Sequence, residues 1–218
     1  MAAVPFSAVV ADQAELRRLY RNPPEVLLKK KVERIDAATA AFIATAPFCL
    51  LATADADGRC DVSPRGGPPG FVRVLDGRRL ALPDLSGNNI LDSLTNVLAN
   101  PHVGLLFVVP GRDETLRLEG NACLTTDPDV LGLWDDELRT PKVAIGIELT
   151  TAYIHCAKSF RRGKVWDPAS WAALDALAPD ACAILVDNLG LDLDPALIRA
   201  DLEKGYEADL TGERAGAT

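Results

Sequence analysis

The feature that most constrains the fold is a dense succession of turns and short apolar runs between Asp61 and Pro110. Two of these runs, Phe71–Leu75 and Arg79–Leu82, flank the dipeptide Asp76-Gly77. An Asp-Gly pair between such runs predicts a β-hairpin with a type I′ turn, in which both central residues have positive φ. The stretch ends in an unbroken apolar run that is typical of a buried strand. We therefore expect antiparallel sheet built through hairpins.

A polar loop, Asp84–Asn89, follows the hairpin and precedes apolar residues at helical spacing: Ile90, Leu91, Leu94, Val97 and Leu98. Backbone N–H groups at the start of a helix attract anions, so this loop indicates a site for a phosphate-bearing ligand. The alternative is that Ser86 only caps the helix, and the preference of serine for N-cap positions favours that local interpretation.

The composition limits the classes of protein that fit this pattern. The 218 residues are enough for one large domain with terminal additions, and a hydrophobic content of 48% supplies its core. The formal net charge of -8 disfavours nucleic-acid binding, which needs a basic face. The chain has no run of about eighteen apolar residues and no basic segment at its N-terminus. We therefore expect no transmembrane helix, no signal peptide, and neither a nucleic-acid nor a membrane partner.

The five cysteines, at positions 49, 60, 123, 156 and 182, favour a reduced, cytoplasmic protein. Their number is odd, no CxxC pair occurs and several lie in apolar strands, so we expect core residues rather than a disulfide framework. The chain has only two histidines, and the adjacent pair His155-Cys156 would point to opposite faces of a strand. We therefore expect no metal site.

The strand signals along the chain predict a barrel. The expected strands span residues 48–54, 60–63, 71–75, 79–82, 103–109, 115–125 and 142–155. Residues 64–70 are expected to form a loop, because their prolines and glycines do not suit a strand ladder. Gly120 within a strand predicts a β-bulge or a barrel bend.

One structural domain with three parts is expected. An N-terminal helical segment (1–47) packs on a barrel (48–170), and a C-terminal helical extension (171–218) follows. Strands and helices do not alternate regularly, and neither GxGxxG nor a P-loop signature occurs, which disfavours a parallel doubly wound sheet. The fold class is therefore mainly β, an antiparallel barrel with helices at both termini and between strands.

Several short motifs occur in an order that is specific as a series, although none is specific alone. They are Ala52-Thr53, Asp57-Gly58, Asp61-Val62-Ser63-Pro64-Arg65-Gly66, Pro69-Gly70-Phe71-Val72, Pro83-Asp84, Gly87-Asn88-Asn89, Asp92-Ser93-Leu94, Asn100-Pro101, Glu114-Thr115-Leu116-Arg117, His155-Cys156-Ala157-Lys158 and Trp166-Asp167-Pro168. With these motifs the chain resembles the pyridoxamine 5′-phosphate oxidase-like family of FMN-binding split barrels, over roughly residues 12–170.

The resemblance implies a six-stranded split barrel and a homodimer with two FMN sites at the subunit interface. It places the FMN phosphate near Ser63–Arg65 and the loop Pro83–Asn89, and it places Asp84 along the flavin. It also places Arg117 on an adjacent strand, and it has the segment His155–Lys158 reaching the site, either within one chain or from the partner.

Two residues depart from the pattern of the subfamily that the chain resembles most. Leu85 and Ile90 stand where that subfamily has arginines, the natural bidentate partners of a phosphate. Arg65 or Arg73 is the expected compensation. The expected cofactor-binding residues are Ser63, Pro64, Arg65, Arg73, Pro83, Asp84, Leu85, Ser86, Asn88, Asn89, Arg117, His155 and Lys158.

For four of these residues a simpler interpretation stays open. Arg117 then points outward on the solvated face of the sheet. Arg65 is then an exposed surface charge, Asp84 a turn residue after proline, and His155 a core histidine.

The function expected from the resemblance is that of an FMN-binding oxidoreductase acting on an unidentified small molecule. One alternative is a non-catalytic binding or sensing module for flavin, deazaflavin or haem, and another is a dimeric scaffold that has lost FMN. No residue is identified as a catalytic acid, base or nucleophile. Pyridoxamine phosphate oxidation itself is not expected, because the basic phosphate loop and the Arg/Trp-rich C-terminus of that enzyme are missing. The acidic helix after Asp180 is expected to be a dimer or lid element.

Overall fold

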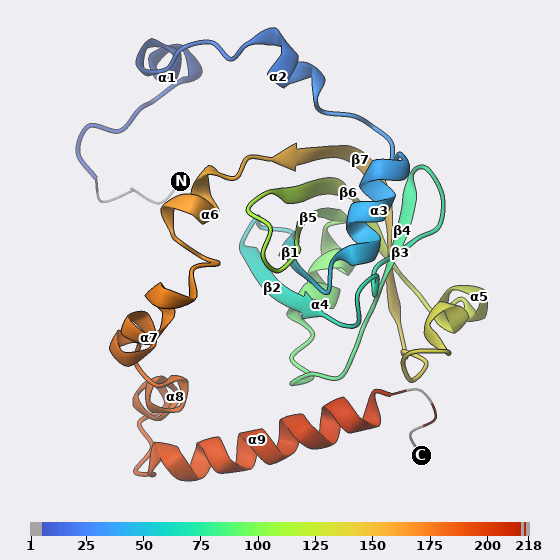
Figure 1. The fold of residues 1–218 in the computed structure, drawn as a ribbon, viewed down its shortest axis with the longest axis vertical. Coiled ribbons are helices and arrows are strands. Elements are labelled where there is room, and N and C mark those ends of the chain that lie inside the picture. Colours follow the sequence, from blue (N-terminus) through green and yellow to red (C-terminus); the bar gives the residue numbers. More distant parts are fainter. Residues whose placement is uncertain (1–5, 215, 217–218) are drawn as a thin grey trace. The chain divides into compact units, whose positions relative to one another are not determined.

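The computed structural model describes residues 6–214 and residue 216 of the chain (Figure 1). Its internal contacts divide the chain into two compact units, Met1–Val32 and Glu33–Thr218. Two short helices lie in the described part of the first unit: α1 (Gln13–Leu19) and α2 (Glu25–Lys29). Neither of them buries a residue. The first unit is thus shorter than the N-terminal segment expected from the sequence, because the third helix belongs to the second unit.

The second unit is built on an antiparallel sheet with the strand order β2-β1-β5-β6-β7-β4-β3. Its strands are β1 (Phe48–Ala54), β2 (Cys60–Gly66), β3 (Arg73–Val74), β4 (Arg79–Pro83), β5 (His102–Val108), β6 (Thr115–Thr125) and β7 (Ala144–His155). The sheet curls until Arg65 on the edge strand β2 hydrogen-bonds with Asp84, just after β4. No ladder among the described residues joins β2 to β3 or β4, so the barrel is split. The predicted antiparallel split barrel is confirmed, with the short β3 as a seventh strand.

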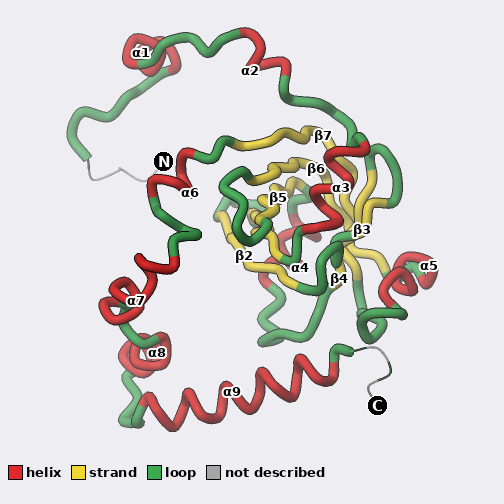
Figure 2. Tube along the Cα trace, viewed as in Figure 1, coloured by secondary structure: helices red, strands yellow, loops and turns green. Residues whose placement is uncertain are grey.

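Helices precede, interrupt and follow the strands of the second unit. They are α3 (Ala37–Thr45), α4 (Asp92–Ala99), α5 (Pro128–Leu131), the 3-10 turn η1 (Gly132–Trp134), α6 (Lys158–Arg162), α7 (Pro168–Leu177), α8 (Ala181–Leu189) and α9 (Pro195–Gly212). The last four follow β7 as a series of helices, which Figure 2 shows in red. The expected C-terminal extension is therefore helical throughout most of its described length.

The β3–β4 hairpin forms as predicted, but its turn differs from the prediction. Neither Asp76 nor Gly77 has positive φ, so the predicted type I′ turn is wrong. Instead, Asp76 Oδ1 accepts hydrogen bonds from the backbone N–H groups of Arg78 and Arg79, both at 2.8 Å. These bonds hold the pKa of the Asp76 carboxyl below its usual value. The aspartate side chain thus forms the turn that a left-handed backbone would otherwise provide.

Strand β2 is longer than the sequence indicated. Residues 64–66 were expected in a loop, yet they pair with β1 as far as Gly66, opposite Phe48. Proline is tolerated there because β2 is an edge strand, where an N–H group is not needed for a second neighbour. The extension carries Arg65 within a ladder rather than on a free loop.

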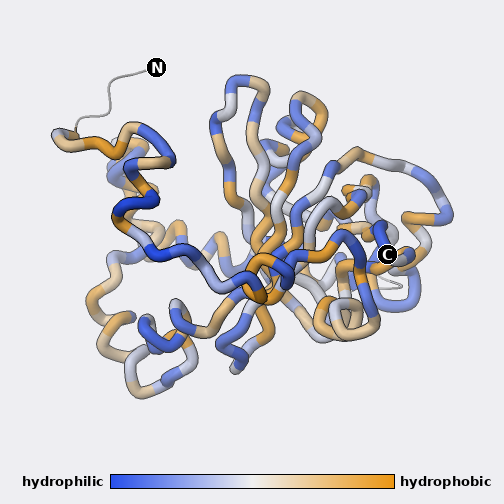
Figure 3. Tube along the Cα trace, turned by 90° about the horizontal axis from the view of Figure 1, so that it is seen from above, coloured by the Kyte–Doolittle hydropathy of each residue, from blue (hydrophilic) through white to orange (hydrophobic). Residues whose placement is uncertain are grey.

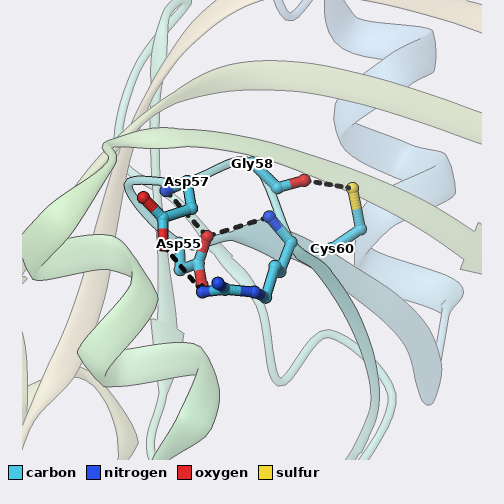
Figure 4. Close-up of polar contacts among 5 residues, drawn as sticks. Asp55, Asp57, Gly58 and Cys60 are labelled. Atoms are coloured by element: carbon cyan, nitrogen blue, oxygen red, sulfur yellow. Dashed lines mark hydrogen bonds and ion pairs between the residues drawn. The ribbon is translucent and has the colours of Figure 1, made fainter. Parts of the chain in front are cut away.

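A tight turn joins β1 to β2 and is fixed by ion pairs (Figure 4). Arg59 Nη1 lies 3.0 Å from a carboxylate oxygen of Asp55 and 2.8 Å from one of Asp57. The Cys60 thiol donates to the carbonyl oxygen of Gly58 over 3.7 Å. These groups lie on the exposed end of the hairpin, so their contribution to stability is small.

Apolar residues from alternate strand positions fill the barrel, and Figure 3 shows hydrophobic and hydrophilic residues interspersed along the chain. The largest fully buried side chains are Trp134, Phe71, Phe107, Ile43, Leu51, Leu80, Leu82, Leu105, Leu118, Ile145 and Leu149. Trp134 Nε1 donates to the carbonyl oxygen of Phe71 at 2.7 Å. This bond satisfies the one polar group of a buried indole and ties η1 to the barrel.

The predicted bulge at Gly120 is confirmed. The register between β6 and β7 shifts between Glu119 and Gly120. A Cβ atom on Gly120 would lie 2.5 Å from the carbonyl oxygen of Glu148, a distance that no real Cβ contact shows. Glycine is therefore required here by the close approach of the two backbones.

The prediction that the cysteines are core residues holds for two of the five. Cys49 and Cys182 are buried, whereas Cys60, Cys123 and Cys156 are exposed. All five are free thiols. Cys60 in β2 and Cys123 in β6 lie on the exposed faces of their strands. The apolar pattern of these strands did not show which face each thiol is on.

One helical stretch, Pro168–Leu189, is long and apolar enough by composition to cross a membrane. Only 6% of the residues in its most apolar part are buried. This finding runs against the expectation of no transmembrane helix, which counted only unbroken apolar runs. The stretch is divided into α7 and α8, and Asp180 caps the second helix by accepting the backbone N–H of Cys182.

Candidate functional site

A cleft of about 700 Å³ brings together most of the residues that the sequence indicated. Four segments line it: residues 61–65 of β2, residues 84–94 after β4, the turn 139–142, and the end of α9 with Asp209 and Glu213. We call this the main cleft. Five carboxylates and three cations face it. The cations are Arg65, Arg139 and Lys142.

A second hollow of about 590 Å³ adjoins the main cleft and shares Arg65 and residues 85–88 with it. Its apolar lining comes from Phe71 of the barrel and from α9. The contributing α9 side chains are those of Leu202, Tyr206 and Leu210. The loop after β4 therefore has a polar cleft on one side and a more apolar hollow on the other.

Arg65 lies where the two sides of the curled sheet meet. Its side chain is 20% exposed, and its Nη1 lies 3.3 Å from Asp84 Oδ1, whose side chain is 23% exposed. Its Nε is buried and has no hydrogen-bond acceptor among the described residues. A buried guanidinium donor without an acceptor is costly and is typical of a position that a ligand or water completes.

Cys49 is the ladder partner of this arginine across β1 and β2. Burial raises the pKa of the Cys49 thiol to about 12, and the positive charge of Arg65 only partly opposes this effect. Cys49 is therefore a neutral, unreactive core group beside Arg65.

The loop between β4 and α4 has a strained backbone. Asn89 and Leu91 have φ angles of 58° and 64°, in the left-handed region. Asparagine tolerates this region, but leucine does so at a cost of about 1–3 kcal/mol. Asn88 Oδ1 accepts the backbone N–H of Ile90 at 3.0 Å and helps to fix the loop. Strain of this kind persists only where the surrounding structure holds it, and it is frequent at ligand sites.

Helix α4 begins at Asp92, after this loop, which corrects the prediction that the loop itself opens the helix. Leu91 is the N-cap and makes no side-chain capping bond, so Ser86 is not the cap. Ile90, Leu91 and Leu98 are exposed, while Leu94 and Val97 are buried. The helix is shorter than its apolar spacing indicated, because the left-handed residues at 89 and 91 delay its start.

Two polar contacts fix α4 against the barrel beside the main cleft. Ser93 Oγ donates to Asp61 Oδ2 at 3.1 Å, and Asn96 Nδ2 donates to Thr53 Oγ1 at 3.0 Å. Thr53 and Ser93 are buried polar residues, so these bonds also satisfy groups that burial would otherwise penalise.

Nine of the predicted site residues line the two hollows. They are Ser63, Pro64, Arg65, Asp84, Leu85, Ser86, Asn88 and Asn89 in the main cleft, and Pro83 in the adjoining hollow. Leu85 also packs against the buried cluster of Ala81, Trp134, Leu138 and Ala144. At position 85 the chain therefore has apolar packing where the resemblance expects an arginine.

Four predicted site residues line neither hollow. Arg73 binds the carbonyl oxygens of Gly70 and Leu133, at 3.0 and 3.3 Å, and pairs with Glu137 at 3.0 Å. Those partners occupy the guanidinium that was expected to compensate for the lost arginines.

The other three lie at the far end of β6 and β7 and in the helix that follows. Arg117 Nη1 donates to the Tyr153 hydroxyl at 2.9 Å, His155 ends β7, and Lys158 begins α6. The structure thus separates these three residues from the loop after β4 within one chain.

Sequence reasoning missed the turn 139–142 and the end of α9. Arg139 and Lys142 flank Thr140-Pro141 and line the main cleft. Two basic residues around a Thr-Pro turn were a usable signal. Glu213 and Asp209 gave no such signal, because they are far from the loop in sequence. Among the described residues, no group of three or more His, Cys, Asp or Glu side chains is placed to hold a metal ion.

A family model described as pyridoxamine 5′-phosphate oxidase matches residues 35–156. No curated protein matches the chain. One of the solved structures that resemble it is HupZ from Group A Streptococcus. The two sequences are 18% identical, the match covers 55% of this chain and 93% of HupZ, and the TM-score is 0.47. A putative pyridoxamine 5′-phosphate oxidase from Lactobacillus delbrueckii has 20% identity, coverages of 57% and 98%, and a TM-score of 0.44. The heme storage protein HutZ from Vibrio cholerae has 17% identity, coverages of 54% and 89%, and a TM-score of 0.37.

Proposed function

The chain belongs to the pyridoxamine 5′-phosphate oxidase family, and from that premise we propose that it binds FMN in the main cleft. The protein would then transfer hydride or electrons between the flavin and a small molecule. The observation that carries this proposal is Arg65, which lines the main cleft and whose buried Nε has no acceptor among the described residues. A phosphate oxygen is a natural acceptor for such a donor.

The residues of the main cleft fit a phosphate-bearing ligand. Arg65 supplies a charged donor and Ser63 a hydroxyl, and the strained loop 84–91 lines the same cleft. Arg139 and Lys142 replace, from another turn, the positive charge that Leu85 and Ile90 do not provide. A volume of about 700 Å³ is within the range of cofactor sites.

Each residue of the proposed site has a role that follows from its contacts. When bound, the flavin supplies the hydride chemistry, and the protein supplies position and electrostatics. Asp84 holds the Arg65 guanidinium at the edge of the main cleft through their ion pair. Cys49 keeps its proton and takes no part. The adjoining apolar hollow, with Phe71 and Tyr206, is the proposed entry for the small-molecule substrate.

The remaining parts of the proposal concern assembly and location. We propose a homodimer in which Arg117, His155 and Lys158 of a second copy complete the site, since within one chain they lie outside both hollows. Five free thiols support a reducing, cytoplasmic compartment.

One observation favours a second candidate, a protein that binds its ligand without turnover or has lost FMN. Asp84, Asp209 and Glu213 add negative charge to the main cleft, and the two arginines expected by resemblance are replaced.

The test is a titration of the purified protein with FMN and with riboflavin, followed by flavin fluorescence. The variant Arg65→Ala is expected to bind FMN about ten- to a hundredfold more weakly, because a charged hydrogen bond contributes about 1.5–3 kcal/mol. Arg59→Ala is the matched control, because Arg59 is an exposed arginine at the other end of the same hairpin. Equal FMN affinity in the wild type and Arg65→Ala would contradict the proposed site.

A further inference from the structure

A carboxylate of the protein itself already occupies a donor of the main cleft. Glu213, which caps the end of α9, accepts the backbone N–H of Ser86 with its Oε1 at 2.7 Å. A phosphate oxygen of a ligand would use the same kind of bond. Ser86 lies in the middle of the loop to which the proposed function assigns the phosphate, so ligand and Glu213 compete for one donor.

The chain holds Glu213 in place through its backbone. The backbone N–H of Arg139 donates to the carbonyl oxygen of Glu213 at 2.7 Å, and Arg214 forms an isolated antiparallel bridge with Leu138. Leu138 is buried in the cluster around Trp134. A single backbone hydrogen bond and one isolated bridge therefore place the end of α9 beside the main cleft, next to two of its cations.

The rest of α9 is only weakly attached. The helix has no buried residue, and Tyr206 and Leu210, which face the adjoining hollow, are 54% and 63% exposed. Near its start, Arg199 forms an ion pair with Asp180 of the α8 cap. A helix held by polar contacts at its ends and by little apolar packing opens locally at low cost.

We propose that the end of α9 is a displaceable strap, in which the Glu213 carboxylate occupies the Ser86 N–H until a phosphate-bearing ligand replaces it. A phosphate dianion is the better competitor, because it has more charge and more acceptor oxygens than a carboxylate, and Arg139 and Lys142 lie beside it. Glu213 thereby selects ligands that carry a phosphate. This inference rests on the proposed function for the identity of the ligand.

The first experiment compares Glu213→Gln with wild type in titrations with FMN and riboflavin. The amide keeps the size of the side chain but removes its charge, so FMN is expected to bind about tenfold more tightly. Riboflavin, which has no phosphate, is expected to bind equally to both proteins. Glu203→Gln is the matched control, an exposed glutamate of the same helix that lines neither hollow. Unchanged FMN affinity in Glu213→Gln would overturn the strap.

The second measurement is amide hydrogen exchange over residues 205–214, with and without FMN or inorganic phosphate. We expect faster exchange there in Glu213→Gln without any ligand, and faster exchange in wild type when FMN or phosphate is added. Slower exchange on ligand addition would overturn the strap.

The two readouts separate the inference from the proposed function. If no variant binds FMN, but phosphate and Glu213→Gln both accelerate exchange over residues 205–214, the FMN proposal fails and the strap stands. If all variants bind FMN equally and exchange does not change, the strap fails and the FMN proposal stands.

Discussion

At the residue scale, the site is defined by the charged side chains around the loop after β4. Arg65 reaches across the split of the barrel to Asp84 and keeps one donor free of acceptors among the described residues. The alternative of a plain surface charge does not fit a guanidinium that is 20% exposed and ion-paired. Asp84 likewise does more than follow a proline in a turn, because it is the partner of that arginine.

The proposed replacement of the missing arginines by Arg139 and Lys142 gives a prediction at this scale. The double variant Arg139→Ala/Lys142→Ala is expected to lose at least tenfold in FMN affinity, because two cations near the phosphate are removed. Riboflavin affinity should not change. Arg17→Ala/Arg18→Ala removes two exposed cations of α1 that line neither hollow and serves as the control. A similar loss in the control would show an effect of net charge rather than of the site.

Cys49 gives a second prediction, because its raised pKa follows from burial. In the folded protein at about pH 8, iodoacetamide is expected to modify Cys60, Cys123 and Cys156 and to spare Cys49 and Cys182. Peptide mass mapping reads out the modified positions.

The pH dependence has a definite sign. The folded-state pKa of the Cys49 thiol is about 12, above its ordinary value of 9.0, so this thiol keeps its proton only in the folded state as pH rises from 9 towards 12. The contribution of Cys49 to stability is therefore complete below pH 9 and declines above it. The variant Cys49→Ala should show a smaller loss of stability across that window. Modification of Cys49 at about pH 8 before unfolding would contradict its burial.

At the scale of elements, most strands could be predicted because their apolar residues alternate or run unbroken. Two predicted boundaries were wrong, because the local sequence pattern indicated one structure and the folded chain adopts another. Prolines and glycines in residues 64–66 indicated a loop, but an edge strand accepts them. Helical spacing after residue 89 indicated an early helix start, but two left-handed residues moved it to Asp92. Both errors fell on segments that line the main cleft.

The bulge at Gly120 gives a prediction for an element. Gly120→Ala is expected to destabilise the protein by about 1–3 kcal/mol, because its Cβ would force the β6 and β7 backbones apart. Gly104→Ala, also within a strand, is the control, since its Cβ would meet only ordinary contacts at 3.8 Å and beyond. Urea denaturation measures both changes. Equal stability of the two variants would show that the close approach at Gly120 is not limiting.

At the scale of the whole molecule, the barrel and the cleft segments in β2 and after β4 could be predicted from the sequence. The turn 139–142 and the end of α9, which also line the main cleft, were not predicted. The hydrogen bond between Glu213 and Ser86 joins residues that are 127 positions apart in the sequence. No pattern in either segment predicts this contact. The position of Glu213 follows from how the turn after η1 and the end of α9 pair, which is a property of the folded chain. The acidic C-terminal helix, expected to be a dimer or lid element, thus lines the proposed ligand site.

The central claim is that this protein is a flavoprotein, and the most direct test is to identify what it carries. The measurement is the absorption spectrum of freshly purified protein, together with the mass of the ligand released on denaturation. We expect a yellow protein, or one that becomes yellow after incubation with FMN, and a released mass equal to that of FMN. A protein that stays colourless after incubation with FMN, or that releases a haem or a deazaflavin, would contradict it.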